Sequence, residues 1–515
     1  MRAIRLAVLS GILIGTSYIP FPPWAIYFCL VPLWIQWLGD PSPRRVFLHG
    51  WVTQFVLTLI GFNWVAYTAV EFGHLPWPIG GLVLVLFSAL FHWHVPAAGV
   101  AWALIHRRWP MSRSRSLWFF AFAFAFFESV WPMIFPWNLG YTWLWGRFPA
   151  MNWADVIGFQ GLSSVTALIN AMVAHAWLGR AQSRVAARWI TAAALILAVL
   201  NATALGREKP WRETDSHLRI LAVQANIGNL EKFWAEDQVN YQENILKRYI
   251  AIANRGLNDG GERPDFLFFP ETAIPINLDM AYSNHYLHQH IMEFFRHHKI
   301  PVVTGAYSQD PVGQKVYNAF FLFDENGEYR DVYRKSILLA FGEYFPGAET
   351  FPFLKDLVPA ISDFGHGPGA KLLDYNGLKI GPQICYEGLY ANHSRELSKL
   401  GAEVFFNATN DSWYGTWSEP YQHLYMTLAR AVEFRRPLMR VTNTGITTGI
   451  LADGTVLDFS PFNTEWTRRF DLPYKKNPPP TLYERFGKHL SLVLLLAMIL
   501  TLLIPTRIPA ESSKK

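Results

Sequence analysis

The chain has 515 residues, of which 51% are apolar or aromatic and only 16% are charged, against roughly 25% in an average soluble protein. This composition excludes a disordered chain and an ordinary soluble protein, and the presence of only two cysteines, Cys29 and Cys385, excludes a disulfide framework. The net charge of +6 does not indicate nucleic-acid binding, because residues 207–488 hold 34 of the 39 acids and 30 of the 45 bases, which leaves the positive excess in the apolar remainder.

The apolar parts of the chain are predicted to cross a membrane. A spanning helix needs roughly 20 mostly apolar residues, and eight stretches approach that requirement: 4–20, 23–38, 48–70, 78–104, 115–135, 157–178, 187–206 and 489–505. We therefore expect a membrane module of seven transmembrane helices at 1–206, an exported domain at 207–488, and an eighth transmembrane helix with a cytoplasmic tail at 489–515. The N-terminal stretch has no small-residue cleavage site and is interpreted as an uncleaved first span.

The basic residues of the short loops predict the orientation, because cytoplasmic loops retain positive charge. With the N-terminus in the cytoplasm, fourteen of the fifteen bases outside 207–488 are cytoplasmic, and Arg147 is the exception. An odd number of spans before residue 207 then places the charged domain outside. The last span returns the C-terminus to the cytoplasm.

Residues 207–488 alternate strand-like runs with helical patterns, which favours an α/β fold with one substantial core. Helices are predicted at about 236–255, 283–298, 390–400 and 420–436. The run 324–327 (DENG) is typical of a hairpin turn. Strands are predicted at 219–225, 265–270, 301–307, 316–323, 378–385, 404–407 and 438–442.

Three residues of this domain stand directly after strand-like runs, where side chains from neighbouring strand ends converge: Glu271, Lys335 and Cys385. Each alone is ordinary, since a lone Cys is usually a small buried hydrophobe and a Lys after a strand is usually solvated. Together they supply a set of catalytic groups. A thiol of pKa near 8.5 needs a base to become a nucleophile, and Glu271 fits that role. Lys335 and the amide of Tyr386 fit the stabilisation of an oxyanion, by about 3–4 kcal/mol per good donor.

The order Glu, Lys, Cys, within the motifs PETA, YRK and CYEG, resembles the nitrilase superfamily, whose catalytic domain is an αββα sandwich. With the preceding spans, the chain resembles the bacterial apolipoprotein N-acyltransferase family over most of its length. The most specific stretches are 333–346 (YRKSILLAFGEYFP), 381–388 (GPQICYEG), 407–415 (NATNDSWYG) and 419–445 (EPYQHLYMTLARAVEFRRPLMRVTNTG). Weaker support comes from 61–67 (GFNWVAY) and 135–143 (FPWNLGYTW).

The resemblance implies a role for each matching residue. Glu271 is then the general base, Lys335 the oxyanion-stabilising lysine and Cys385 the nucleophile. Glu343, Tyr386 and Glu387 match supporting residues of the active site. An alternative for Glu343 is an ion pair that only holds Lys335, and for Glu387 a helix cap without a part in the chemistry.

Two departures from the family pattern bear on the site. Ala340 stands where the family usually has Pro, which predicts a less rigid loop before Glu343. Gly228 also replaces a Pro, ahead of the position where the family has a lipid-contacting Trp. Direct counting reaches Phe233, with Trp234 one residue later, so the lipid-contacting aromatic is one of these two.

The resemblance further implies a phospholipid donor, chiefly phosphatidylethanolamine, and as acceptor the α-amine of the N-terminal diacylglyceryl-cysteine of an apolipoprotein. The enzyme is then a multi-pass protein of the bacterial inner membrane, with its catalytic domain in the periplasm and both termini in the cytoplasm, and it uses no metal or other cofactor. Aromatic residues in loops after the catalytic strands are candidates for a dry wall against the lipid, and the run 346–370 is long enough to move. They are Phe341, Tyr344, Phe345, Phe351, Phe353, Trp413, Tyr414 and Trp417.

Two other interpretations remain open at this point. The first is a membrane-tethered amidase or nitrilase acting on a small C–N substrate, which the three catalytic residues alone do not exclude, although such a hydrolase needs no membrane module. The second is a transporter or lipid-binding protein with an inactive nitrilase-like domain, against which the intact set of Glu271, Lys335 and Cys385 argues.

Overall fold

The structure is a computed structural model that describes residues 4–309, 315–348, 350, 351, 353 and 363–503; the side chains of Phe233, Glu236 and Asp237 also lie outside the description. Internal contacts divide the chain into two compact units. One comprises Met1–Asn63, Gly81–Arg207 and Arg485–Lys515, and the other comprises Trp64–Gly80 and Glu208–Glu484. The second unit therefore joins the charged part of the chain to a segment that the sequence assigned to the membrane module.

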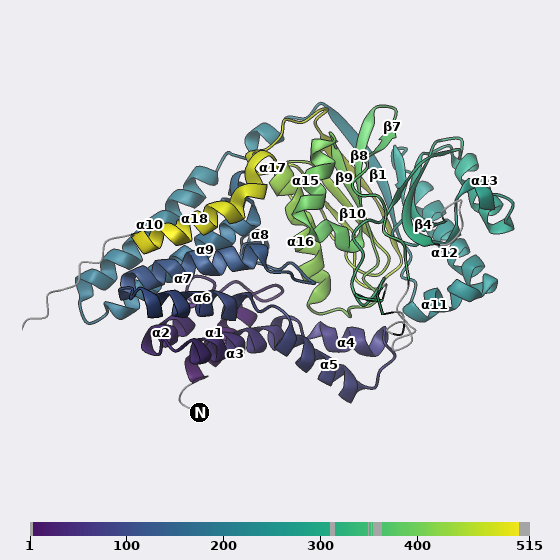
Figure 1. Ribbon diagram of the computed structural model, residues 1–515. Coiled ribbons are helices and arrows are strands. Elements are labelled where there is room, and N and C mark those ends of the chain that lie inside the picture. The colour runs from purple at the N-terminus through teal and green to yellow at the C-terminus, as the bar shows by residue number, and fades with distance from the viewer. Residues whose placement is uncertain (1–3, 310–314, 349, 352, 354–362, 504–515) are drawn as a thin grey trace, which may run out of the picture. The chain divides into compact units, whose positions relative to one another are not determined.

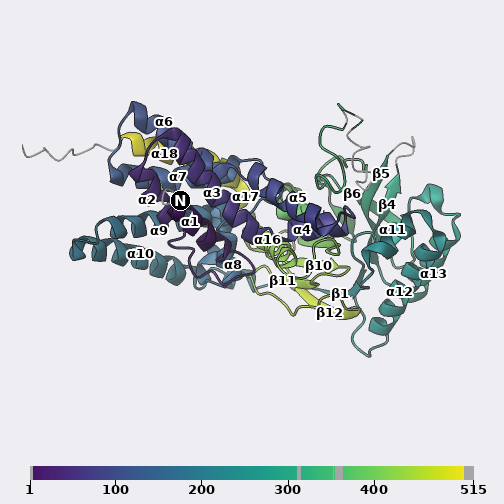
Figure 2. The same ribbon diagram turned by 90° about the horizontal axis from the view of Figure 1, so that it is seen from below.

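The first unit is helical in its described part (Figures 1 and 2). Close backbone approach holds several of its helices together: a Cβ on Gly50 would lie 2.7 Å from the Cα of Pro96, so two helices meet where only glycine fits. Helix α5 (Trp77–Leu90) begins in the second unit and ends in this one. The remaining helices are α1 (Arg5–Gly15), α2 (Val31–Gly39), α3 (Pro43–Gly61), α6 (His94–Arg108), α7 (Arg113–Val130), α8 (Tyr141–Trp145), α9 (Ala154–Leu178), α10 (Ser183–Ala204) and α18 (Leu490–Leu503).

Several of these helices carry the length and exposed apolar surface of membrane spans. Among the described residues, four helical stretches are long and apolar enough to cross a bilayer: Trp77–Arg108, Pro149–Leu178, Ser183–Trp211 and Leu482–Leu503. The pair Pro43–Gly61 and Trp64–Glu71, bent by 59°, would make a fifth. Leu195 and Leu500 are about 60% exposed, as expected of lipid-facing side chains (61% and 60%). The expected count of eight spans, and the domain bounds drawn from it, stay predictions.

The second unit contains two sheets packed face to face between layers of helices (Figure 1). Phe268 stacks on Phe406 of the facing sheet with ring centroids 4.9 Å apart, so aromatic side chains fill the space between the sheets. The larger sheet has the order β12-β1-β2-β4-β5-β6, with β3 also paired to β4, and the smaller has the order β11-β10-β9-β8-β7. Their strands are β1 (Ser216–Gln224), β2 (Phe266–Phe268), β3 (Ile274–Asn277), β4 (Val302–Gln309), β5 (Val316–Phe323), β6 (Tyr329–Arg334), β7 (Leu373–Tyr375), β8 (Leu378–Ile384), β9 (Val404–Thr409), β10 (Leu438–Thr442), β11 (Thr448–Ile450) and β12 (Trp466–Tyr474).

Amphipathic helices cover the outer faces of both sheets, which gives the predicted αββα sandwich. Alternate residues of a strand face opposite sides, so Leu267 joins the core under the helices while Phe268 faces the other sheet. Figure 2 shows α12 and α13 over the larger sheet. The helices of this unit are α4 (Trp64–Glu71), α11 (Asn229–Asp237), α12 (Val239–Leu257), α13 (Tyr286–His298), α15 (Ala391–Lys399), α16 (Glu419–Phe434) and α17 (Leu482–Phe486), of which the last ends beyond the unit's border.

All seven strands predicted from the sequence are confirmed, and 316–323 and 438–442 match to the residue. The four predicted helices are confirmed within a few residues. The prediction missed the short strands β3, β7 and β11, the strands β6 and β12, and the helices α11 and α17. The run 346–370, expected to be long enough to move, is only partly covered, because residues 349, 352 and 354–362 lie outside the described part of the chain; its wall candidates Phe351 and Phe353 are described and exposed.

Candidate active site

Glu271 lies on a tight turn that follows β2 and rests on β4. A Cβ on Gly305 of β4 would lie 2.5 Å from the Pro270 oxygen and 2.6 Å from the Cα of Glu271, so only glycine admits this turn. Thr272 has a left-handed backbone with φ +45°, which a β-branched residue rarely adopts. The carboxylate of Glu271 is buried and accepts a hydrogen bond of 2.7 Å from Asn318 on β5.

Lys335 follows β6, and its ammonium joins two carboxylates. Its Nζ lies 3.2 Å from Oε1 of Glu271 and 2.8 Å from Oε1 of Glu343. The residue is 1% exposed. Burial alone would lower the pKa of Lys335, but the charges of Glu271 and Glu343 outweigh burial and raise this pKa above its ordinary value. Lys335 is therefore a fixed ammonium at any physiological pH.

Glu343 is held by the backbone of the loop that carries it. Its Oε2 accepts the Leu339 N–H at 2.9 Å, and its backbone N–H bonds the Leu339 oxygen, also at 2.9 Å. Ala340, where the resemblance implies Pro, pairs with Tyr344 in a β-bridge, and Phe341 adopts a left-handed φ of +63°. Backbone pairing thus holds the loop at Ala340, and the lower rigidity expected from the missing proline stays a prediction.

Cys385 stands at the point where β8 ends and a short 3-10 helix (Cys385–Leu389) begins. Its φ of +50° is unusual for a residue other than glycine, and such strain is common at nucleophiles on a sharp strand-to-helix turn. Burial and the charge of Glu271 raise the pKa of the Cys385 thiol, which the Lys335 charge lowers in part. The thiol is therefore protonated at rest, and both charged partners lie within electrostatic range of it. The structure thus brings the three residues singled out from the sequence together.

Glu387 links the segment that follows Lys335 to the turn that carries Cys385. The side chain is fully buried, and its Oε1 accepts hydrogen bonds from the Tyr333 hydroxyl at 2.6 Å and the Ser336 N–H at 2.7 Å. Its Oε2 accepts the Ile384 N–H at 2.8 Å, which caps the 3-10 helix. The residue therefore fixes the backbone on both sides of the site. Tyr386 is also buried, and its hydroxyl bonds that of Tyr390 at 2.5 Å.

The aromatic candidates fall into different surroundings. Tyr414 is buried edge-on against Trp64 with centroids 5.4 Å apart, and Trp413 packs on Phe72 at 4.8 Å, so their loop contacts the segment Trp64–Gly80. Burial and the nearby charge of a Cys385 thiolate raise the pKa of the Tyr414 hydroxyl, which places Tyr414 close to the nucleophile.

Four further aromatic candidates lie in the loop after Lys335 (Phe341 and Tyr344) and on α11 (Phe233 and Trp234). Phe341 is 43% exposed, and Tyr344 packs on His366 at 5.4 Å. Trp234 is exposed and packs on Tyr241 at 5.0 Å. The side chain of Phe233 lies outside the described part of the chain, so the choice between Phe233 and Trp234 stays open.

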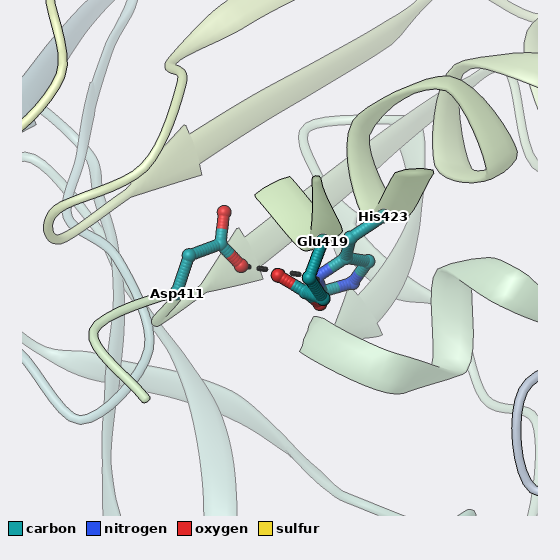
Figure 3. A group of neighbouring side chains, drawn as sticks. All are labelled: Asp411, Glu419 and His423. Carbon is teal, nitrogen blue, oxygen red and sulfur yellow. Dashed lines mark hydrogen bonds and ion pairs between the residues drawn. The ribbon is translucent and has the colours of Figure 1, made fainter. Parts of the chain in front are cut away.

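A buried charged cluster supports the loop that carries Trp413 and Tyr414 (Figure 3). Asp411 accepts hydrogen bonds from Arg440 at 2.7 Å and from Nδ1 of His423 at 3.0 Å, while Glu419 lies 3.5 Å from the same nitrogen. Potential metal-ligating atoms of Asp411, Glu419 and His423 lie within 4.8 Å of one another. The Arg440 guanidinium already balances Asp411, so we interpret the cluster as an ion-pair network. Burial and the charge of Asp411 raise the pKa of the Glu419 carboxyl.

Sequence reasoning did not single out Asn318, Lys232 or the four members of this cluster. Asn318 bonds both Glu271 and Glu343, at 2.7 and 3.1 Å, yet it lies inside an ordinary strand pattern. Asp411, Glu419, His423 and Arg440 fall inside the stretches 407–415 and 419–445 that carry the resemblance, which was the available signal. Lys232 follows the first strand by eight residues, and no local pattern marks it.

The fold is that of a carbon–nitrogen hydrolase domain of the nitrilase type, and the carbon-nitrogen hydrolase family matches residues 219–468, which include Glu271, Lys335 and Cys385. The N-terminal domain family of apolipoprotein N-acyltransferases matches residues 10–172. An apolipoprotein N-acyltransferase of Bdellovibrio bacteriovorus is 44% identical over 96% of this chain and 92% of its own length. That of Geobacter metallireducens is 30% identical over 94% and 92%. The chain belongs to the apolipoprotein N-acyltransferase family.

Proposed function

We propose that the chain transfers an acyl chain from a phospholipid, through a thioester on Cys385, to the α-amine of the N-terminal diacylglyceryl-cysteine of bacterial apolipoproteins. This is the last step of lipoprotein maturation. The observation that carries the proposal is the meeting of Glu271, Lys335 and Cys385 in one buried site of a chain that also contains helices apolar enough to span a bilayer. Family membership supports the same activity.

In the first half-reaction, Glu271 accepts the Cys385 proton as the sulfur attacks the ester carbonyl of the donor. Negative charge develops on the carbonyl oxygen. Lys335 commits two N–H groups to carboxylates among the described residues, and its third is available to this oxyanion together with the backbone N–H of Tyr386. When the C–O bond breaks, Glu271 returns its proton to the leaving alkoxide, and a lysophospholipid departs.

In the second half-reaction, the free amine of the lipoprotein attacks the thioester. Glu271 removes a proton from the attacking nitrogen, the C–S bond breaks, and the proton returns to the Cys385 sulfur. An amide forms, and the resting thiol is restored. The two half-reactions share one nucleophile, so the kinetics are ping-pong.

Both substrates keep acyl chains in the bilayer, so a site at the outer surface of the inner membrane suits them. Positive charge in the short loops supports placing the catalytic domain in the periplasm, with phosphatidylethanolamine as the abundant donor. The aromatic residues Trp413, Tyr414 and Phe341 then line the lipid side of the site and keep water from the thioester. The lipid-contacting residue of α11 is Phe233 or Trp234.

The activity is tested with purified protein, phosphatidylethanolamine and a synthetic diacylglyceryl-cysteine peptide. We expect triacylated peptide and lysophospholipid in equal amounts, and neither from the Cys385→Ala variant. Cys29→Ala is the matched control, because it removes the other thiol. Release of free fatty acid without peptide acylation would contradict the proposal, and hydrolysis of small amides at a comparable rate would favour the rival amidase activity.

A further inference from the structure

Lys232 places a second ammonium group beside the catalytic base. It lies on α11, whose first turn follows β1 by only a few residues. The Nζ of Lys232 donates hydrogen bonds to the backbone oxygen of Glu271 at 3.2 Å and to the Thr272 hydroxyl at 3.0 Å. Both partners belong to the tight turn that carries the base.

Helix α11 is itself held firmly in position. The Asn229 side chain donates to the Ser412 oxygen at 2.9 Å, and Glu231 pairs with Arg248 of α12 at 3.1 Å. Gln242 of α12 donates to the Ala235 oxygen at 2.8 Å. These bonds present Lys232 to the turn from a fixed support.

The charge of Lys232 acts on the reacting groups as well. Burial lowers the pKa of Lys232 to about 8, although the charges of Glu271 and of a Cys385 thiolate raise it in part. The Glu271 carboxylate thus lies within electrostatic range of two ammonium groups, Lys335 and Lys232. Other charged groups act on Cys385 as well, of which Asp411 raises the pKa of the thiol.

We propose that Lys232 is a positioning residue of the active site, which holds the left-handed turn at Thr272 and thereby the Glu271 carboxylate, and whose positive charge stabilises the Cys385 thiolate. The turn needs such support, because Thr272 adopts a strained backbone and Gly305 allows the turn to lie directly on β4. The Lys335 ammonium contacts the side-chain oxygens of Glu271 and Glu343, whereas Lys232 bonds the backbone of the turn itself. This inference rests on the proposed function only for its consequence in acyl transfer.

The test is the pH dependence of Cys385 alkylation by iodoacetamide, in the full chain with Cys29→Ala. The alkylation rate reports the thiolate fraction of Cys385 without any lipid. A negative result for Lys232 is therefore distinct from failure of the proposed acyl transfer. In Lys232→Met we expect the pH midpoint of Cys385 alkylation to rise by about one unit. At any pH below that midpoint, the thiolate fraction is then about tenfold lower than in the parent. Lys247→Met is the control, because Lys247 is a 61% exposed lysine paired with Glu243 on α12. Its midpoint should not move.

Lys232→Arg separates charge from mere packing. An arginine stays charged above pH 8, where the lysine loses its proton, so this variant should equal the parent at pH 7 and be alkylated faster than the parent above pH 8. If Lys232→Met does not fold, as judged by its melting temperature, this comparison alone decides. Alkylation profiles of Lys232→Met or Lys232→Arg that superimpose on the parent would overturn the proposal.

Discussion

Replacing Glu387 by Gln changes one buried oxygen to an NH2 group and leaves the shape of the side chain. In the structure the carboxylate accepts hydrogen bonds from the Tyr333 hydroxyl, the backbone and hydroxyl of Ser336, and the backbones of Ile337 and Ile384. Four of these five bonds end on Oε1 and one on Oε2. A glutamine therefore keeps most of them only when its oxygen takes the place of Oε1, which puts its NH2 against the Ile384 N–H.

The size of the effect follows from this count. A buried donor left without its acceptor costs about 1–3 kcal/mol, and the four remaining bonds weaken because they end on a neutral oxygen. We expect a loss of about 3 kcal/mol in the free energy of unfolding, or about 5–10 °C in melting temperature. Because Ser336 and Ile384 adjoin Lys335 and Cys385, the rate of Cys385 acylation should also fall.

The measurement is thermal unfolding of the detergent-solubilised protein at pH 7, followed by single-turnover acylation with phosphatidylethanolamine. Glu396→Gln is the matched control, since the Glu396 side chain is 57% exposed and forms a surface ion pair with Lys399; its effect should stay within about 0.5 kcal/mol. A Glu387→Gln protein that melts and acylates like the parent would refute the reasoning, because the hydrogen bonds would then not hold the site.

Three further changes test other parts of the structure. Gly305→Ala puts a Cβ 2.5 Å from the Pro270 oxygen, which should displace the Glu271 turn. Acylation of Cys385 should then slow about 100-fold. An unchanged single-turnover rate would show that the turn can shift without cost to the reaction. Glu419 has a raised pKa in the fold, so its contribution to stability is fully present below its unfolded pKa and lost as pH rises through the folded value. The melting temperature of the parent relative to Glu419→Gln should thus fall with rising pH, and a constant difference would contradict the raised pKa. Cys29→Ala should retain acyl transfer, and a large loss would give Cys29 a part in the reaction.

The strands that could be predicted share one physical property. Runs such as 316–323 (VYNAFFLF) and 438–442 (LMRVT) are rich in apolar residues and mostly buried, because both faces of their sheets are covered. Strand β12 was missed because it lies beside β1 at the sheet edge and its residues Arg468, Arg469 and Asp471 interrupt the apolar pattern. Strands β3, β7 and β11 have three or four residues, too few to show a period.

The site was predictable where a reactive residue follows a strand, as for Glu271 and Cys385. Asn318 and Lys232 could not be found this way, because only tertiary packing brings them to the Glu271 turn. For Glu387, the sequence left open an active-site role or a helix cap. The carboxylate does cap the Ile384 N–H, and it also binds the segment after Lys335, a long-range contact that no local pattern reveals.

Intact-mass measurement of the purified protein after incubation with phosphatidylethanolamine, in the absence of any acceptor, tests the central claim most directly. We expect a mass increase of one acyl chain, mapped to Cys385, released by hydroxylamine and absent from Cys385→Ala. Its formation should slow in Glu271→Gln, which lacks the base. Acyl transfer to a lipopeptide without such an adduct, or an adduct on another residue, would contradict the thioester at Cys385.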